Sequence, residues 1–143
     1  MINIYMYSKK TVAFVCCFIV CVNLILIYGN YRCDNPDFKD ILETRLGIGE
    51  MDGWSLSHLS FFMFIGYHFE GKYLIAAFLL GVLWEGFEHY YGTERPGWLG
   101  GYGDCDMQTN REDGSWWYGK WTDIVMNLIG LVLGSHLLKK IIR

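Results

Sequence analysis

Three ionisable side chains lie inside long apolar stretches of the sequence, where such side chains are uncommon. His58, Glu85 and Asp123 each stand among leucine, isoleucine, valine, phenylalanine or other bulky apolar residues. A charged side chain that faces lipid costs about 3 kcal/mol or more, so these three are expected to face other polar groups. Two carboxylates and an imidazole placed together can act as general base and acid, or can hold a divalent cation. We therefore take them as the candidate catalytic residues. A divalent cation is the one cofactor that these residues suggest, and the sequence does not establish a metal site.

Further polar residues accompany two of these three at helical spacing. Glu88 and His89 follow Glu85 by about one turn, and Asn127 follows Asp123 by one turn. Residues three and four apart lie on one helix face, so we predict that all three are binding residues of the same site. Two other interpretations stay open. Polar side chains near a helix end can reach water, and buried ones can serve only as hydrogen bonds between helices.

Four apolar segments must position these side chains. Hydrophobic residues make up 52% of the 143 residues and aromatic residues 17%, a composition that favours lipid as the surrounding solvent. Helices of this length come close to spanning the hydrocarbon layer at 1.5 Å per residue. We predict an all-α polytopic membrane protein, a small bundle of four transmembrane helices in a single domain, 1–143. The crossings are about 11–28, 54–69, 73–91 and 121–138, joined by polar loops at about 29–53 and 92–120.

The two long loops differ in character. The first contains PDFKDILETRLG, residues 36–47, whose apolar spacing between Pro36 and Gly47 predicts a short surface helix. The second is rich in glycine, acids and aromatic residues and shows no periodicity. A loop of nearly thirty residues is uncommon unless it has a function.

The charge pattern limits the partners and suggests an orientation. The net charge is −3 and no basic stripe is present, which argues against nucleic acid as a partner. Membrane lipid, and a protein partner at the outer loops, are the expected partners, while the sequence does not indicate an oligomeric state. An even number of crossings puts both termini on one side, and the basic residues there, with almost no acids among them, predict that both termini are cytoplasmic.

The five cysteines fall into two groups. Cys33 and Cys105 lie in the two outer loops and could form a disulfide if that side is oxidising, although two unpaired thiols are an equal alternative. Cys16, Cys17 and Cys21 lie in the first apolar segment, where a thiol behaves as a small hydrophobic group. Palmitoylation of Cys16 or Cys17 is a further alternative. The segment itself lacks a typical cleavage site, which favours a retained anchor over a cleaved secretory signal.

The last apolar segment carries the most specific pattern. Asp123 begins D-x-x-x-N-x-x-G-x-x-x-G, in which Gly130 and Gly134 form a small-xxx-small pair that lets a neighbouring helix approach closely. This pattern, with the histidine of SLSHLSFFMFIGY and the acid of LLGVLWEGFEHYYG, resembles the VanZ-like family of small polytopic membrane proteins. The resemblance covers about residues 54–134 and carries over His58, Glu85, Asp123, Asn127, Gly130 and Gly134.

The resemblance implies an architecture more than an activity. VanZ-like proteins have been linked to glycopeptide-antibiotic resistance and cell-surface physiology, and no firm biochemical activity follows from membership. The sequence differs from the family where glutamine is usual, since Glu88 and His89 stand there. It differs also in the long connection before the last segment.

Two functions compete at this stage. The polar residues could bind or act on a lipid headgroup or a lipid-linked group, with the aromatic loop as a lid. Alternatively, they could lock the bundle of a structural or scaffolding component in a membrane-bound assembly, for instance a viral or organellar one. No obvious nucleophile or phosphate-binding motif is present, which favours a protein that is not an enzyme without deciding the question.

Overall fold

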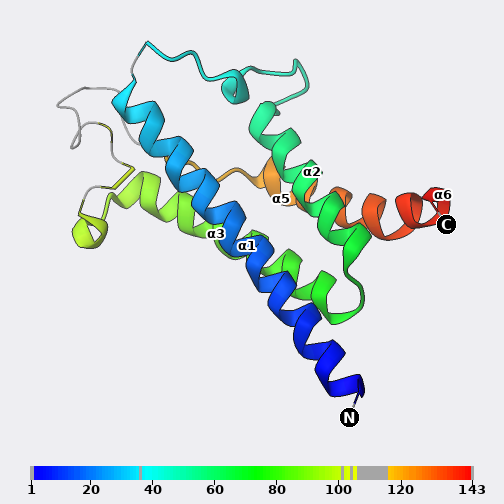
Figure 1. Cartoon of the computed structure of the whole chain (residues 1–143). Helices are drawn as coiled ribbons and strands as arrows, with labels where there is room; N and C mark the ends of the chain where they lie inside the picture. Colours follow the sequence, from blue (N-terminus) through cyan, green and yellow to red (C-terminus); the bar gives the residue numbers. More distant parts are fainter. Residues whose placement is uncertain (1, 36, 101, 104, 106–115, 143) are drawn as a thin grey trace.

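The structure is all-helical over the residues it describes. It is a computed structural model that describes residues 2–35, 37–100, 102–103, 105 and 116–142. Figure 1 shows how the long helices follow one another along the chain. The main helices are α1 Ile2–Asp34, α2 Gly53–His68, α3 Lys72–Glu94 and α5 Trp121–Val132, and the short elements are η1 Ile41–Glu43, η2 Gly97–Leu99, the π-helix η3 Leu133–Leu138 and α6 Lys139–Ile142. The all-α prediction is therefore confirmed for the described part of the chain.

Two helical stretches in this part of the chain are long and apolar enough to cross a membrane. They are Lys9–Asp34 in α1 and Trp121–Leu138, which joins α5 to η3. α2 has only 16 residues. α3 is longer, with 23 residues, but its apolar character is interrupted by Glu85 and Glu88.

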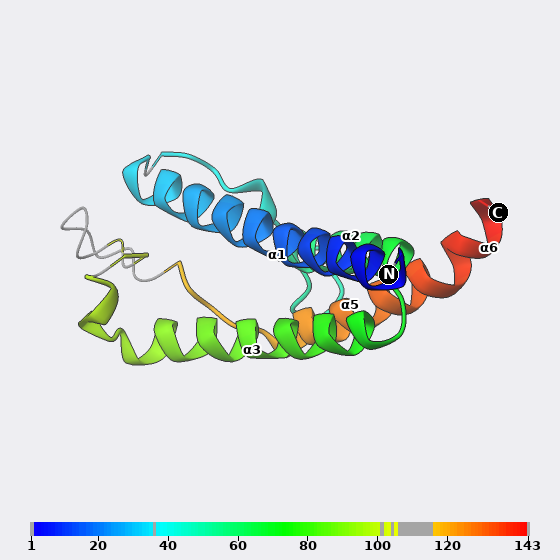
Figure 2. The same ribbon diagram turned by 60° about the horizontal axis from the view of Figure 1, so that its bottom comes forward.

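The helices run so that the two ends of the molecule differ. Figure 2 shows both chain termini at the end that carries the short turn between α2 and α3. We call this the termini end. The carboxyl ends of α1 and α3 lie at the opposite end, which we call the loop end. The turn at the termini end is tight because Gly71 adopts a positive φ of 59° and α3 begins at the next residue.

Helices α2 and α5 pack closely through glycine. A Cβ atom on Gly134 would lie 2.1 Å from the carbonyl oxygen of Met63, and one on Gly130 would lie 2.5 Å from that of Leu59. Gly66 makes the reciprocal approach from α2. Real Cβ atoms do not come this near to an oxygen, so each position has room only for hydrogen. The predicted packing glycines thus lie where α5 and η3 meet α2.

Two apolar clusters hold the bundle at its two ends. Near the termini end, side chains of α1, α2, α3 and α5 meet around Phe14, Phe62, Ile65, Phe69, Tyr73, Ala77 and Leu131. Thr11 and Tyr73 add a hydrogen bond of 2.8 Å between their hydroxyl groups. At the loop end the buried residues are Cys33, Tyr91, Trp116 and Trp117. α1 is thereby attached to the other helices near both of its ends.

α1 is longer than predicted. The apolar pattern indicated residues 11–28, whereas the helix continues to Asp34 because no proline or paired glycine precedes Pro36. Gly29 lies within the helix against the indole of Trp116, where a Cβ atom would come within 2.2 Å of the ring. The α3 helix also extends to Glu94, three residues beyond its predicted end.

The predicted surface helix in residues 36–47 is wrong apart from one 3-10 turn, Ile41–Glu43. The Asp40 carboxylate accepts a hydrogen bond of 2.8 Å from the backbone of Leu42 and caps this turn. The chain then folds back, with Leu46 N donating to Met51 O at 2.9 Å around Gly47, whose φ is +77°. Part of the other predicted loop, residues 106–115, lies outside the described residues.

Candidate functional site

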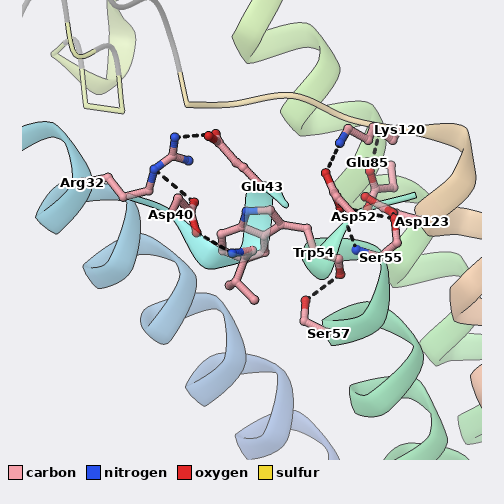
Figure 3. A network of polar contacts seen from close by, with 11 residues as sticks. Arg32, Asp40, Glu43, Asp52, Trp54, Ser55, Ser57, Glu85, Lys120 and Asp123 are labelled. Atoms are coloured by element: carbon pink, nitrogen blue, oxygen red, sulfur yellow. Dashed lines mark hydrogen bonds and ion pairs between the residues drawn. The ribbon is translucent and has the colours of Figure 1, made fainter. Parts of the chain in front are cut away.

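The first turn of α2 is joined to the first turn of α5 by polar contacts. Asp52 caps α2 by accepting a hydrogen bond of 3.1 Å from the backbone N–H of Ser55. The hydroxyl of Ser55 donates to Asp123 Oδ1 at 2.5 Å. The ammonium group of Lys120, just before α5, pairs with Asp52. Figure 3 shows this network, in which two buried carboxylates from different elements share one serine.

His58 lies one turn further along α2, between α3 and α5. Its Nδ1 is 2.9 Å from Oδ1 of Asn127, and its Nε2 is 3.4 Å from Oε1 of Glu85. Its side chain is 13% exposed. The imidazole therefore connects polar residues of three helices.

Glu85 is held by the segment that leads into α5. Its Oε2 accepts a hydrogen bond of 2.9 Å from the backbone N–H of Lys120. Gly119 lies directly on α3, where a Cβ atom would be 2.1 Å from the carbonyl oxygen of Glu85. The other carboxylate oxygen, Oε1, has no hydrogen-bond partner although Glu85 is only 3% exposed.

The candidate residues of the three helices meet at one place. One ligand atom each from His58, Glu85 and Asp123 lie within 4.8 Å of one another. Asn127 is fully buried beside them, and its Nδ2 lies against Gly81, where a Cβ atom would be 2.7 Å away. We refer to these four residues, His58, Glu85, Asp123 and Asn127, as the polar cluster.

The structure separates the two remaining predicted binding residues. Glu88 lines a small cavity together with His58, Asp123 and Tyr118. The side chain of His89, in contrast, is exposed. The inward stripe of α3 runs from Glu85 through Glu88 to Gly92, where a Cβ atom would be 2.1 Å from the carbonyl oxygen of Trp117. Contrary to the prediction, His89 falls outside this stripe and does not join the polar cluster.

An apolar cavity adjoins the polar cluster. It has a volume of about 740 Å³ and lies between α1, α2 and α3. Its walls include Phe18 and Ile25 of α1, Phe61 of α2 and Trp84 of α3. His58 lines it as well, and so belongs both to the cavity wall and to the polar cluster. A single molecule with an apolar part and a polar end could contact both.

The loop end is closed by covalent and aromatic contacts. Cys33 and Cys105 form a disulfide with a Cα–Cα distance of 5.0 Å, which ties α1 to the segment after α3. The indole N–H of Trp117 donates to the carbonyl oxygen of Tyr102 at 3.0 Å. The hydroxyl of Tyr102 donates to the carbonyl oxygen of Leu26 at 2.8 Å. These bonds fix the distance between α1 and α3 above the cavity.

A second polar network holds the segment between α1 and α2. Arg32 Nε lies 3.2 Å from Asp40, and its terminal nitrogen lies 2.5 Å from Glu43. Tyr28 donates a hydrogen bond of 2.6 Å to Asp40. Burial, and after it the carboxylates of Glu43 and Asp52, raise the pKa of the nearby Tyr118 phenol above its usual value. These residues belong to the scaffold of the loop end, and Figure 3 shows Arg32, Asp40 and Glu43 beside the first network.

No protein-family model, curated protein or solved structure matches this chain. The resemblance to VanZ-like proteins therefore stays a prediction that rests on the residues named above.

Some residues of the site were not predicted from the sequence. Neither Asp52 nor Ser55 is among the residues that the sequence analysis assigned to the site. The spacing D-x-x-S before an apolar segment is a helix-capping signal that could have placed both at the start of α2. Lys120 comes just before α5, but nothing in the local sequence indicates that its backbone N–H reaches Glu85.

Proposed function

We propose that this chain is a multi-pass membrane protein that crosses the bilayer with all four long helices and binds a lipid or lipid-linked molecule. The headgroup lies at the polar cluster and the apolar chain lies in the cavity. Both termini are cytoplasmic in this arrangement, and the disulfide lies on the opposite, oxidising side. The resemblance to the VanZ-like family supports the same four-helix architecture.

The outer surface of the helices supports the four crossings. Large apolar side chains outside the cavity wall are exposed on α1, α3 and α5, among them Val20 at 57%, Ile75 at 66%, Leu79 at 55% and Leu128 at 50%. In water such exposure would be unfavourable, whereas lipid tails accept it. α2, with 16 residues, spans about 24 Å and reaches the hydrocarbon boundary with its polar cap at Asp52 near the headgroups.

The observation that carries the proposal is the contact between the apolar cavity and the polar cluster at His58. A volume of about 740 Å³ is within the range of sites that bind small molecules. The polar cluster offers a carboxylate oxygen without a hydrogen-bond partner at this junction. A packed scaffold requires neither an open apolar cavity nor an unpaired polar atom beside it.

The chemistry of the site favours binding over catalysis. Ser55 is fully buried and its hydroxyl donates to Asp123, so it cannot reach a substrate in the cavity. Of the free cysteines Cys16, Cys17 and Cys21 on α1, Cys21 lines the cavity, where its neighbours Val22 and Leu24 are apolar and such surroundings do not favour the reactive thiolate. The polar cluster can accept hydrogen bonds and balance positive charge, which suffices to hold a headgroup.

Two serines of α2 provide a matched test. Ser57 lines the cavity, whereas Ser60 is exposed and lies outside the cavity wall, and both hydroxyls donate to backbone carbonyl groups of their own helix. Ser57→Trp is expected to fill the cavity, and Ser60→Trp leaves it open. Each variant would be reconstituted with a phospholipid that carries a photoactivatable diazirine in its acyl chain, and the crosslinked residues would be located by mass spectrometry.

We expect wild type and Ser60→Trp to give crosslinks on the cavity-lining residues of α1 and α3, and Ser57→Trp to lose them while crosslinks on the outer surface persist. Crosslinks confined to the outer surface in all three proteins would contradict lipid binding in the cavity. That result would favour the alternative in which the chain is a structural component of a membrane assembly.

A further inference from the structure

The carboxylates around His58 outnumber the positive groups that face them. Asp52, Glu85, Glu88 and Asp123 come from α3, α5 and the cap of α2. Among the ion pairs of the described residues, the ammonium group of Lys120 is the one lysine or arginine group that pairs with any of these four carboxylates, and its partner is Asp52. The polar cluster thus places Glu85 and Asp123 together beside one imidazole, with no lysine or arginine ion pair to either in the described part of the chain.

The hydrogen bond between Asn127 and His58 indicates which nitrogen of the imidazole carries hydrogen. Oδ1 of Asn127 is an acceptor and lies 2.9 Å from Nδ1, so Nδ1 is the protonated nitrogen of a neutral His58. Its Nε2 then presents a lone pair to Oε1 of Glu85, 3.4 Å away. Two acceptor atoms that face each other in a buried site require either a hydrogen or a cation between them.

A metal ion satisfies both atoms. A histidine that binds a metal through one nitrogen commonly donates its other N–H to a carbonyl or carboxylate oxygen, which fixes the orientation of the ring. Asn127 supplies that oxygen here. Oε1 of Glu85, buried and without a hydrogen-bond partner, is the second available donor atom.

We infer that the polar cluster binds one divalent transition-metal ion through His58, Glu85 and Asp123, and that Asn127 positions the imidazole. An imidazole with two carboxylates is a donor set suited to Zn²⁺ or Mn²⁺. Donor atoms about 2.1 Å from such an ion lie about 3 to 4 Å from one another. The three atoms lie within 4.8 Å, so side-chain movements of less than about 1 Å close the site.

Binding of a lipid headgroup to this ion, the second part of the inference, rests on the proposed function and refines it. Three protein ligands leave at least one coordination position open. Because His58 also lines the apolar cavity, that position is accessible from the cavity side. An anionic phosphate headgroup, which the carboxylates alone would repel, then binds to the ion with its apolar chain in the cavity.

The test uses the metal alone. Full-length protein without a histidine tag would be purified in detergent with the disulfide intact, stripped with a chelator, and titrated with Mn²⁺ by electron paramagnetic resonance and with Zn²⁺ by calorimetry. We expect about one ion per chain. Glu85→Gln and Asp123→Asn should weaken affinity at least about 10-fold. His89→Gln, on the exposed face of the same helix as Glu85, is the matched control and should bind as wild type does.

A second measurement identifies the imidazole directly. Electron spin-echo modulation from bound Mn²⁺ should show a ¹⁴N coupling that disappears in His58→Gln and persists in His89→Gln. This readout on wild type and His89→Gln stands even if the acidic variants fail to fold, a failure that loss of the disulfide on a non-reducing gel would reveal. No saturable binding by wild type, or equal binding by His58→Gln, would overturn the inference.

The two proposals can fail independently. Crosslinks in the cavity of chelator-treated protein without any metal binding would leave lipid binding intact and refute the metal. In that case a hydrogen between Glu85 and His58 takes the place of the ion. Metal binding at the polar cluster without crosslinks in the cavity would support the metal site and contradict lipid binding in the cavity.

Discussion

Substitution of Gly134 tests the closest helix contact of the fold. A Cβ atom at this position would lie 2.1 Å from the carbonyl oxygen of Met63 and 2.8 Å from the backbone nitrogen of Tyr67. Carbon and oxygen need at least about 3 Å, so α2 and η3 must separate by close to 1 Å in Gly134→Ala. Overpacking of this kind costs about 1 to 3 kcal/mol. The higher helix propensity of alanine returns at most about 1 kcal/mol.

Gly86 is the matched control because it lies in α3 with nothing within 4 Å of its would-be Cβ atom. There the propensity gain stands alone, and Gly86→Ala should be more stable than wild type by about 0.5 to 1 kcal/mol. Unfolding would be followed by tryptophan fluorescence as dodecyl sulfate is titrated into maltoside micelles. The two substitutions should shift the midpoint in opposite directions. If Gly134→Ala is as stable as Gly86→Ala, the close approach of α2 and η3 is refuted.

Three further substitutions test the loop end and the site. Cys33→Ser opens a disulfide that spans a sequence separation of 72 residues, which by chain entropy stabilises the fold by about 4 kcal/mol. An unfolding midpoint that is the same in wild type and variant, and that reductant does not change, would show that the bond is absent. Lys120→Met leaves Asp52 buried without its cation and should destabilise the fold by about 3 kcal/mol. Asp52→Asn in the same chain should partly reverse this loss. Additive effects of the two substitutions in a double-mutant cycle would contradict the ion pair. Trp117→Ala removes a side chain that is 2% exposed and should cost about 3 to 5 kcal/mol, whereas Trp98→Ala, at 64% exposed, should cost less than about 1 kcal/mol, and equal losses in thermal unfolding would argue against the aromatic cluster.

The periodicity of apolar residues sufficed to place the helices, because each apolar run is bounded by polar or glycine-rich stretches. α2 and α3 begin within one residue of the predicted positions, and the last helix covers the predicted range 121–138. Its last third in that range, Leu133–Leu138, is π-helical, and α6 continues it to Ile142. The ends of α1 were not predictable from hydropathy. Polar residues such as Asn30 and Arg32 look like loop by composition but continue the helix, because helical hydrogen bonds form regardless of side-chain polarity.

The sequence predicted the residues of the candidate site as far as the position of a residue along its helix could be read from the apolar segments. His58, Glu85 and Asp123 were expected to face other polar groups, and the structure places their ligand atoms within 4.8 Å of one another. Rotation of a helix about its axis is harder to infer, since α3 has apolar residues on every side, and this is why His89 was grouped with Glu85. The cavity could not be predicted at all, because it depends on where the disulfide and the tryptophans hold α1.

The contribution of α5 to the polar cluster has a consequence for how the protein is made. Asp123 and Asn127 belong to the last of the four long helices to leave the ribosome, and Lys120 directly precedes it. These residues supply the partners of Ser55, His58 and Glu85. In the proposed four-crossing arrangement, α2 and α3 would lie in the membrane before that helix inserts, with His58 and Glu85 lacking these partners. An incomplete chain therefore differs from a finished one by exposed intramembrane polar groups, a feature by which quality-control proteases could distinguish the two.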